Sequence, residues 1–150
     1  MKSVYDAPTG QEIRDRIAAI GPNAGRQWGR MSAAQMLAHC AVGMEMALGQ
    51  VRPRRMLVGR VIGGVIKRKA LGDDRPISRN APTAPDLLVR DERSFDAERG
   101  RLLGLYDRFI AAGPAGCTTH PHAFFGQMTP DEWGRLTWKH LDHHLRQFGA

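Results

Sequence analysis

Apolar residues recur at helical spacing along most of the chain, and Ser, Thr, Gly and Pro mark where each run begins and ends. No stretch shows the bounded alternation of apolar and polar residues that is typical of a strand. We therefore expect an all-α fold, with residues 1–150 forming a single domain of four main helices and one extra helix. The predicted helices cover residues 8–20, 32–48, 54–71, 94–112 and 129–148.

Three of these helices begin with capping-box spacing, in which a Ser or Thr is followed three residues later by Glu or Gln. The pairs are Thr9 with Glu12, Ser32 with Gln35 and Thr129 with Glu132. Ser94 is a further N-cap candidate, and Pro130 suits the first helical position. The proline-rich stretch 72–90 predicts a long crossover, and 113–128 predicts a loop.

The histidines carry the candidate chemistry. The 32–48 helix holds one charged residue, Glu45, so we expect it to be buried on most sides, His39 included. In the last helix, His140 and His144 lie one turn apart on the same side as Trp133, facing the core. Four polar residues fall on the opposite side: Arg135, Lys139, Asp142 and Arg146.

Three imidazoles in a helical core admit two interpretations. In one, His39, His140 and His144 bind a divalent cation, leaving an open position for chemistry. In the other, the same rings form a hydrogen-bonded network with Thr137, Gln35 or Gln147, because an unpaired buried polar group costs roughly 1–3 kcal/mol. Neither Glu45 nor Asp142 lies on the histidine side, so no carboxylate base is expected there.

The remaining histidines lie around this group. His143 falls at the edge of the buried side, and His120 and His122 lie in the preceding loop. His143 and His120 are candidate proton shuttles, because histidine titrates near neutral pH, although an exposed loop position also explains His120. Cys40 is interpreted as a small buried residue.

The excess positive charge of the chain is confined to one segment. The 150 residues include 22 Lys and Arg against 15 Asp and Glu, a formal net charge of +7. Residues 52–79 hold nine of the basic residues and two of the acidic ones, which accounts for the whole excess. With no signal-peptide pattern, no run long enough to span a membrane and two cysteines, we expect a cytoplasmic protein.

Three segments together resemble the DinB/YfiT-like four-helix-bundle superfamily, and within it an uncharacterised subgroup: QWGRMSAAQMLAHC, HPHAFFG and EWGRLTWKHLDHHLRQFG. The resemblance implies an up-down-down-up bundle with a long crossover, and a divalent metal, often zinc or nickel, held by His39, His140 and His144. It also implies a small-molecule substrate, including low-molecular-weight thiols, and a homodimer. The basic 52–79 insertion has no counterpart in that pattern.

The functional hypothesis is therefore a metal-dependent transferase or hydrolase. The alternative is a non-catalytic metal- or ligand-binding bundle whose basic segment docks to an anionic membrane surface or a partner. Nucleic acid is not expected, because residues 52–79 contain no aromatic side chain to stack on bases.

Overall fold

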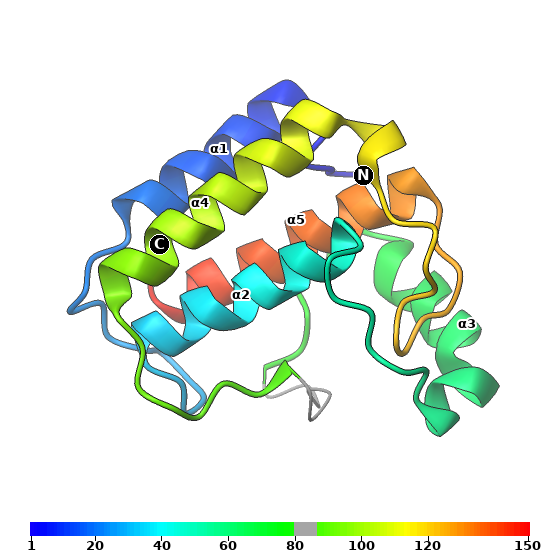
Figure 1. The fold of residues 1–150 in the computed structure, drawn as a ribbon, viewed down its shortest axis with the longest axis horizontal. Helices are drawn as coiled ribbons and strands as arrows, with labels where there is room; N and C mark the ends of the chain where they lie inside the picture. Colours follow the sequence, from blue (N-terminus) through cyan, green and yellow to red (C-terminus); the bar gives the residue numbers. More distant parts are fainter. Residues whose placement is uncertain (80–86) are drawn as a thin grey trace.

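In the computed structural model, which describes residues 1–79 and 87–150, the chain is all-helical (Figure 1). The α-helices are α1 (Ala7–Ala19), α2 (Ala33–Ala47), α3 (Leu57–Leu71), α4 (Phe95–Ala112) and α5 (Pro130–Gln147), with a short 3-10 helix, η2 (Pro114–Gly116). In the described ranges the only β pairing is one isolated bridge, between His122 and Gly126. None of the described helices is both long and apolar enough to cross a membrane.

The helix starts follow the predicted caps with one exception. Both capping boxes at Ser32 and Thr129 are formed, and the Ser94 hydroxyl accepts the Ala97 amide. The box predicted at Thr9 is wrong, because α1 begins earlier, with Asp6 as N-cap and no side-chain cap. A proline is tolerated in the first turn of a helix, and Pro8 occupies that place here.

Four helices form a ring around the core, in which each packs against two others: α1 against α4 and α5, and α2 against α4 and α5. Long-range contacts fix their directions. Arg16 pairs with Asp142, so α1 runs parallel to α5, whereas the Tyr106 hydroxyl donates to the Gly10 carbonyl across antiparallel α1 and α4. Figure 1 shows α2 and α4 running one way and α1 and α5 the other.

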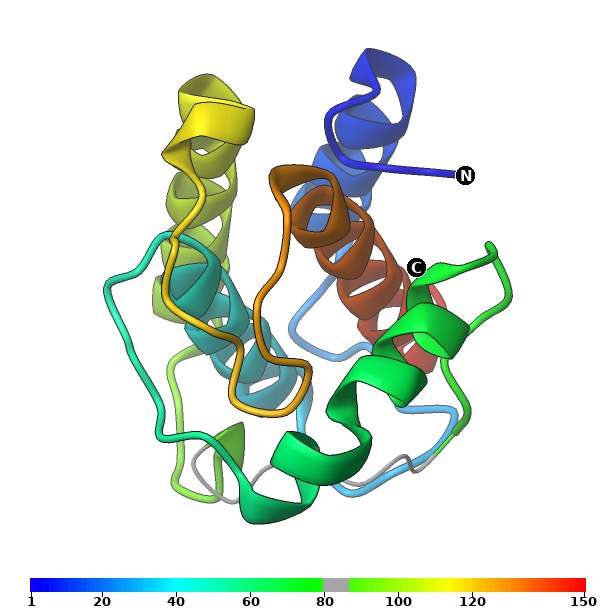
Figure 2. The same cartoon turned by 90° about the vertical axis from the view of Figure 1, so that its right-hand side faces the viewer.

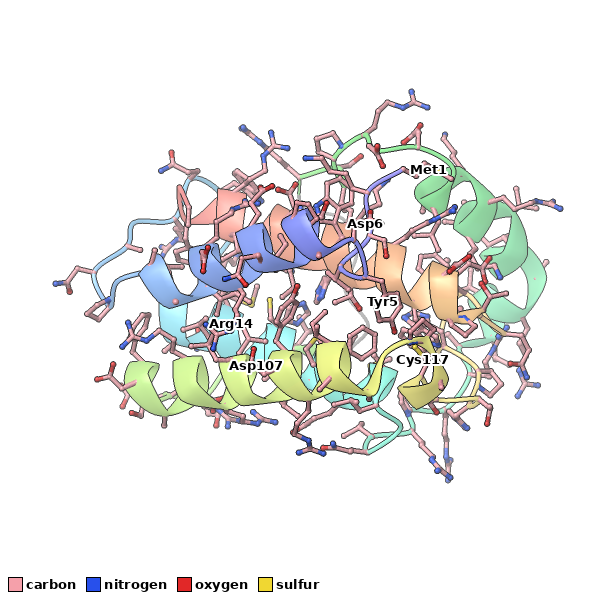
Figure 3. All side chains as sticks on the ribbon, turned by 90° about the horizontal axis from the view of Figure 1, so that it is seen from above. Met1, Tyr5, Asp6, Arg14, Asp107 and Cys117 are labelled. Atoms are coloured by element: carbon pink, nitrogen blue, oxygen red, sulfur yellow. The ribbon has the colours of Figure 1, made fainter. Side chains whose placement is uncertain are left out.

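Buried side chains from all four helices fill the centre of this ring, among them Ile13, Met36, Tyr106, Phe109 and Leu141. Polar links bind the ring at its surface. Arg14 forms two hydrogen bonds with Asp107 between α1 and α4, and the Tyr5 hydroxyl lies 2.9 Å from the Cys117 sulfur (Figure 3). The core therefore holds α2 and α5 side by side along their length.

The extra helix α3 lies outside the ring, in front of it in Figure 2. It packs through its glycines: a Cβ at Gly59 would lie 2.5 Å from the Phe124 carbonyl oxygen, and one at Gly63 would overlap that oxygen. Six of its apolar side chains are exposed to solvent: Leu57, Val58, Val61, Ile62, Val65 and Ile66. This inverts the usual arrangement, in which the apolar side of a helix faces the core.

Lysines anchor α3 to α5. Lys67 donates to Glu132 and to the Gln127 carbonyl, while Lys139 donates to the carbonyls of Ala70 and Asp73. Lys139, predicted on the side of its helix opposite the histidines, is nevertheless only 6% exposed. The extra helix covers that side of α5 and supplies the carbonyls that its ammonium needs.

Candidate metal centre

Three histidines from α2 and α5 meet inside the bundle. His39 lies in the middle of α2, and His140 and His144 lie one turn apart on α5. Their ring centroids are 4.7 to 4.9 Å apart. One ligand nitrogen from each lies within 4.8 Å of the other two. The structure thus brings together the three residues that the helical projection placed in the core.

Hydrogen bonds at the outer nitrogens orient two of these rings. The Nδ1 of His39 lies 2.8 Å from the Leu87 carbonyl oxygen, and the Nδ1 of His144 lies 2.9 Å from the Gln147 side-chain oxygen. The Gln147 amide in turn donates to the Trp28 carbonyl at 2.8 Å. Because a carbonyl oxygen only accepts, both Nδ1 atoms carry the proton, and both Nε2 atoms are free to act as ligands.

The donor set fits a divalent cation. His39 Nε2 lies 2.9 Å from His140 Nε2, so in the absence of an ion His140 Nε2 supplies the proton that joins them. A metal ion displaces such a proton when it binds. A tetrahedral zinc about 2.0–2.1 Å from each nitrogen sets them about 3.3 Å apart. The distance between His39 Nε2 and His140 Nε2 would lengthen slightly. The ligand nitrogens that now lie up to 4.8 Å apart would approach each other by at most about 1.5 Å.

Burial keeps these imidazoles neutral. His39 and His144 are 4% and 8% exposed, and His140 is partly buried. Burial lowers the pKa of His39 against the opposing effect of the Leu87 carbonyl, and it lowers the pKa of His144 to about 3. The pKa of His140 lies well below its usual range, first because of burial and then because of the neighbouring histidines. Neutral imidazole is the form that binds metals.

Space for the His140 ring comes from a glycine on the facing helix. A Cβ at Gly43 of α2 would lie 3.2 Å from His140 Cε1 and 3.3 Å from its Nδ1. A larger residue at this position would push the ring away from the cluster. Gly43 was not predicted to belong to the site, and neither was Leu87, whose contribution is a backbone carbonyl.

The two carboxylates considered as possible bases, Glu45 and Asp142, are already paired. Arg101 holds Glu45 at 2.6 Å, and Arg16 holds Asp142 at 2.9 Å. In the part of the chain that the structure describes, the histidine group contains no carboxylate and no cysteine. Cys40 is buried against Met36, and burial raises the pKa of its thiol. The site therefore consists of neutral nitrogen ligands.

His143 lies beside the cluster, and a pocket of about 430 Å³ opens next to it. Its ring centroid is 4.9 Å from that of His144 and 5.6 Å from that of Trp28. The guanidinium of Arg79 lies 4.5 Å above the Trp28 ring at the same pocket. Burial lowers the pKa of His143, although a hydrogen bond to the Ile77 carbonyl opposes this. The volume of the pocket beside it is within the range of small-molecule sites.

Neither histidine of the preceding loop belongs to this group. His120 is partly buried in the 117–129 loop, where its amide bonds to Thr118, and no described contact joins its ring to the three histidines. His122 accepts the amides of Phe124 and Phe125 through Nδ1, and burial followed by the nearby Arg55 lowers its pKa to about 4. His122 therefore shapes the loop that supports α3.

An all-helical protein with three convergent, neutral histidines, two of them buried and one partly buried, belongs to the class of bundles that can hold a metal between facing helices. Over residues 4–150 the sequence matches the family described as "Protein of unknown function (DUF1569)", and the chain belongs to that family. No curated protein and no solved structure matches it in the other two comparisons.

Proposed function

We propose that the protein is a divalent-metal-dependent enzyme of the DinB-like superfamily, acting as a transferase or hydrolase with zinc or nickel at His39, His140 and His144. The observation that carries this is the convergence of three imidazoles, two of which are turned inwards by hydrogen bonds at Nδ1. Histidines held in this way resemble metal ligands with their supporting partners.

The directions of the helices support the superfamily assignment. An up-down-down-up order requires α2 and α4 to be parallel, and Arg101 of α4 reaches Glu45 of α2 while Gln35 at the start of α2 bonds to the Asp91 carbonyl just before α4. The long connection between the two helices is consistent with that order. The extra helix α3 remains a feature of this chain that the superfamily pattern does not explain.

When bound, the metal would act as a Lewis acid or lower the pKa of a water or thiol ligand. The chain's contribution is to hold the three rings, to keep them neutral by burial and to exclude competing carboxylates. Because no described carboxylate stands ready as a general base, we favour water or a low-molecular-weight thiol as the nucleophile. His143 stands where it can carry a proton between the pocket and the cluster.

The pocket beside His143 is the proposed entrance for a small-molecule substrate. A shuttle role for His120 remains a prediction, since its ring makes no described contact with the cluster. A homodimer in the cytoplasm also remains a prediction. Gly59 and Gly63 of α3 pack against Phe124 of the same chain.

A second candidate is a non-catalytic bundle. It is favoured by the fact that His39 and His144 already have partners for Nδ1, and that His39 and His140 can bond to each other without an ion. The two candidates differ in whether the cluster binds metal and in whether an exchangeable position remains on it.

Metal analysis of the purified protein tests the proposal. We expect about one zinc or nickel ion per chain, lost in His39→Ala, His140→Ala and His144→Ala and retained in His120→Ala, with circular dichroism showing that each variant folds. In the cobalt-loaded protein, a spectral change on adding a small thiol would show an open position. Wild-type protein that binds neither zinc nor nickel in calorimetry would leave only the hydrogen-bonded network.

A further inference from the structure

The outward side of α3 combines apolar and basic side chains in a way that the histidine site does not explain. Leu57 and Val61 are 79% and 82% exposed, and Val65, on the same side one turn further, is 59% exposed. Val58, Ile62 and Ile66 are also exposed. We call the six together the α3 apolar face. Monomeric proteins rarely expose continuous apolar patches larger than roughly a few hundred Å², and patches near that size often mark binding sites.

Packing explains why this face is turned outwards. The opposite side of α3 carries Gly59 and Gly63, which lie against the backbone of Phe124 too closely for any side chain. Lys67 and Lys139 fasten the same side to the rest of the protein. The helix therefore cannot turn to bury its apolar face without breaking these contacts, so the face is available to a partner.

Basic residues border the α3 apolar face. Arg60 follows Leu57 by three positions, Arg68 follows Val61 by seven and Lys69 follows Val65 by four, which places each cation beside the stripe on a helix. These three residues are exposed, and among the described residues they form no ion pair. Residues 51–72 contain no Asp or Glu at all.

We propose that the α3 apolar face docks on an anionic membrane surface. Apolar side chains enter the boundary between head groups and acyl chains, while Arg60, Arg68 and Lys69 extend along the surface to the lipid phosphates. Charge complementarity selects this partner. A second copy of the chain would place the same cations against one another with no acid on either helix to balance them.

The area of the α3 apolar face also favours a membrane over a protein partner. A helix of 15 residues is about 22 Å long and about 10–12 Å wide, so one side of it offers roughly a few hundred Å². A stable protein interface buries roughly 800 Å² on each partner. An isolated helical face of this kind is sufficient for reversible attachment to a membrane, where apolar insertion and charge act together.

Co-sedimentation with vesicles of phosphatidylcholine, with and without about one third phosphatidylglycerol, tests the proposal. We expect binding to the anionic vesicles only, weakened by salt. Arg60→Glu/Arg68→Glu should lower the partition coefficient by at least about tenfold, and Leu57→Gln/Val61→Gln should lower it comparably. These side chains are exposed, so the variants should fold as the wild type does.

Matched controls lie elsewhere on the surface. Arg26→Glu/Arg30→Glu makes the same change in net charge, and Ile110→Gln removes another exposed apolar side chain; both should bind as the wild type does. Equal loss in the controls would show a response to net charge alone and overturn the proposal, as would no binding to anionic vesicles. A dimer in light scattering that Leu57→Gln/Val61→Gln dissociates would assign the face to a second copy instead.

Discussion

At the scale of single residues, the geometry of the histidine cluster depends on groups outside the set of three candidate ligands. Gln147 accepts from the Nδ1 of His144 with its oxygen and donates to the Trp28 carbonyl with its amide. These two bonds fix both the rotation of the ring and the nitrogen that faces His39. Leu87 does the same for His39 with a backbone carbonyl, which no side-chain pattern in a sequence can reveal.

Replacing Gln147 by Leu should therefore weaken metal binding while leaving all three ligands in place. Loss of a supporting partner of a ligand typically costs 10- to 100-fold in metal affinity, and we expect a loss of about that size. Competition with a chromophoric chelator measures it. Gln147→Glu keeps an oxygen opposite His144 Nδ1 and should restore most of the affinity. If both variants bind metal as the wild type does, Gln147 has only a packing role.

At the scale of elements, helix starts were predictable where the signal is local. Ser32, Ser94 and Thr129 cap their helices as expected, because a cap depends on a few consecutive residues. The start of α1 was displaced, because the helix begins at Ala7 without a side-chain cap and takes Pro8 into its first turn. The inward side of α5 was also predictable from helical spacing, and with it the meeting of His140 and His144 with His39.

The orientation of α3 could not be predicted in the same way. Periodicity identifies which side of a helix is apolar, but it does not say which side packs when the neighbour is a backbone segment that only glycine can approach. The burial of Lys139 was missed for the same reason, since its partners are carbonyls of a segment more than 60 residues earlier in the chain. Both features depend on tertiary contacts.

Adjacent glycines in α3 provide a test of this packing. Gly63→Ala would place a methyl group against the Phe124 carbonyl, whereas a Cβ at Gly64 meets nothing within 4 Å. We expect Gly63→Ala to lower the free energy of unfolding by about 1–3 kcal/mol through overpacking. Gly64→Ala should raise it by up to about 1 kcal/mol, because alanine favours a helix. Urea denaturation distinguishes them, and equal effects would mean that α3 does not pack through its glycines.

At the scale of the whole molecule, the two features of interest occupy different parts of the fold. The excess charge lies in residues 52–79, and the rest of the chain carries equal numbers of acidic and basic residues. The histidine cluster lies between α2 and α5, inside the ring, whereas Arg60, Arg68 and Lys69 of α3 are exposed. The net charge is thus a property of one segment, residues 52–79, and says little about the chemistry in the core.

This separation predicts that Arg60→Gln/Arg68→Gln/Lys69→Gln leaves metal binding intact. Metal content should equal that of the wild type, and affinity should stay within about twofold, because salt and solvent screen exposed charges over a Debye length of about 8 Å. Calorimetry with zinc or nickel measures both quantities. A loss of affinity several times larger would show that the charge of α3 tunes the cluster and that the two features form one functional unit.

Lys139 contacts the end of α3 and lies next to a histidine of the cluster. A substitution there therefore contrasts with the triple variant of the exposed cations. Its ammonium holds the end of α3 through the carbonyls of Ala70 and Asp73, and its backbone neighbour is His140. Lys139→Met should release the end of α3 and disturb α5 at the ligand, lowering both vesicle binding and metal affinity. The triple variant should lower vesicle binding alone. This pair of results is expected if Lys139 connects α3 to the histidine cluster as a structural anchor. It is not expected if the exposed charges of α3 make that connection.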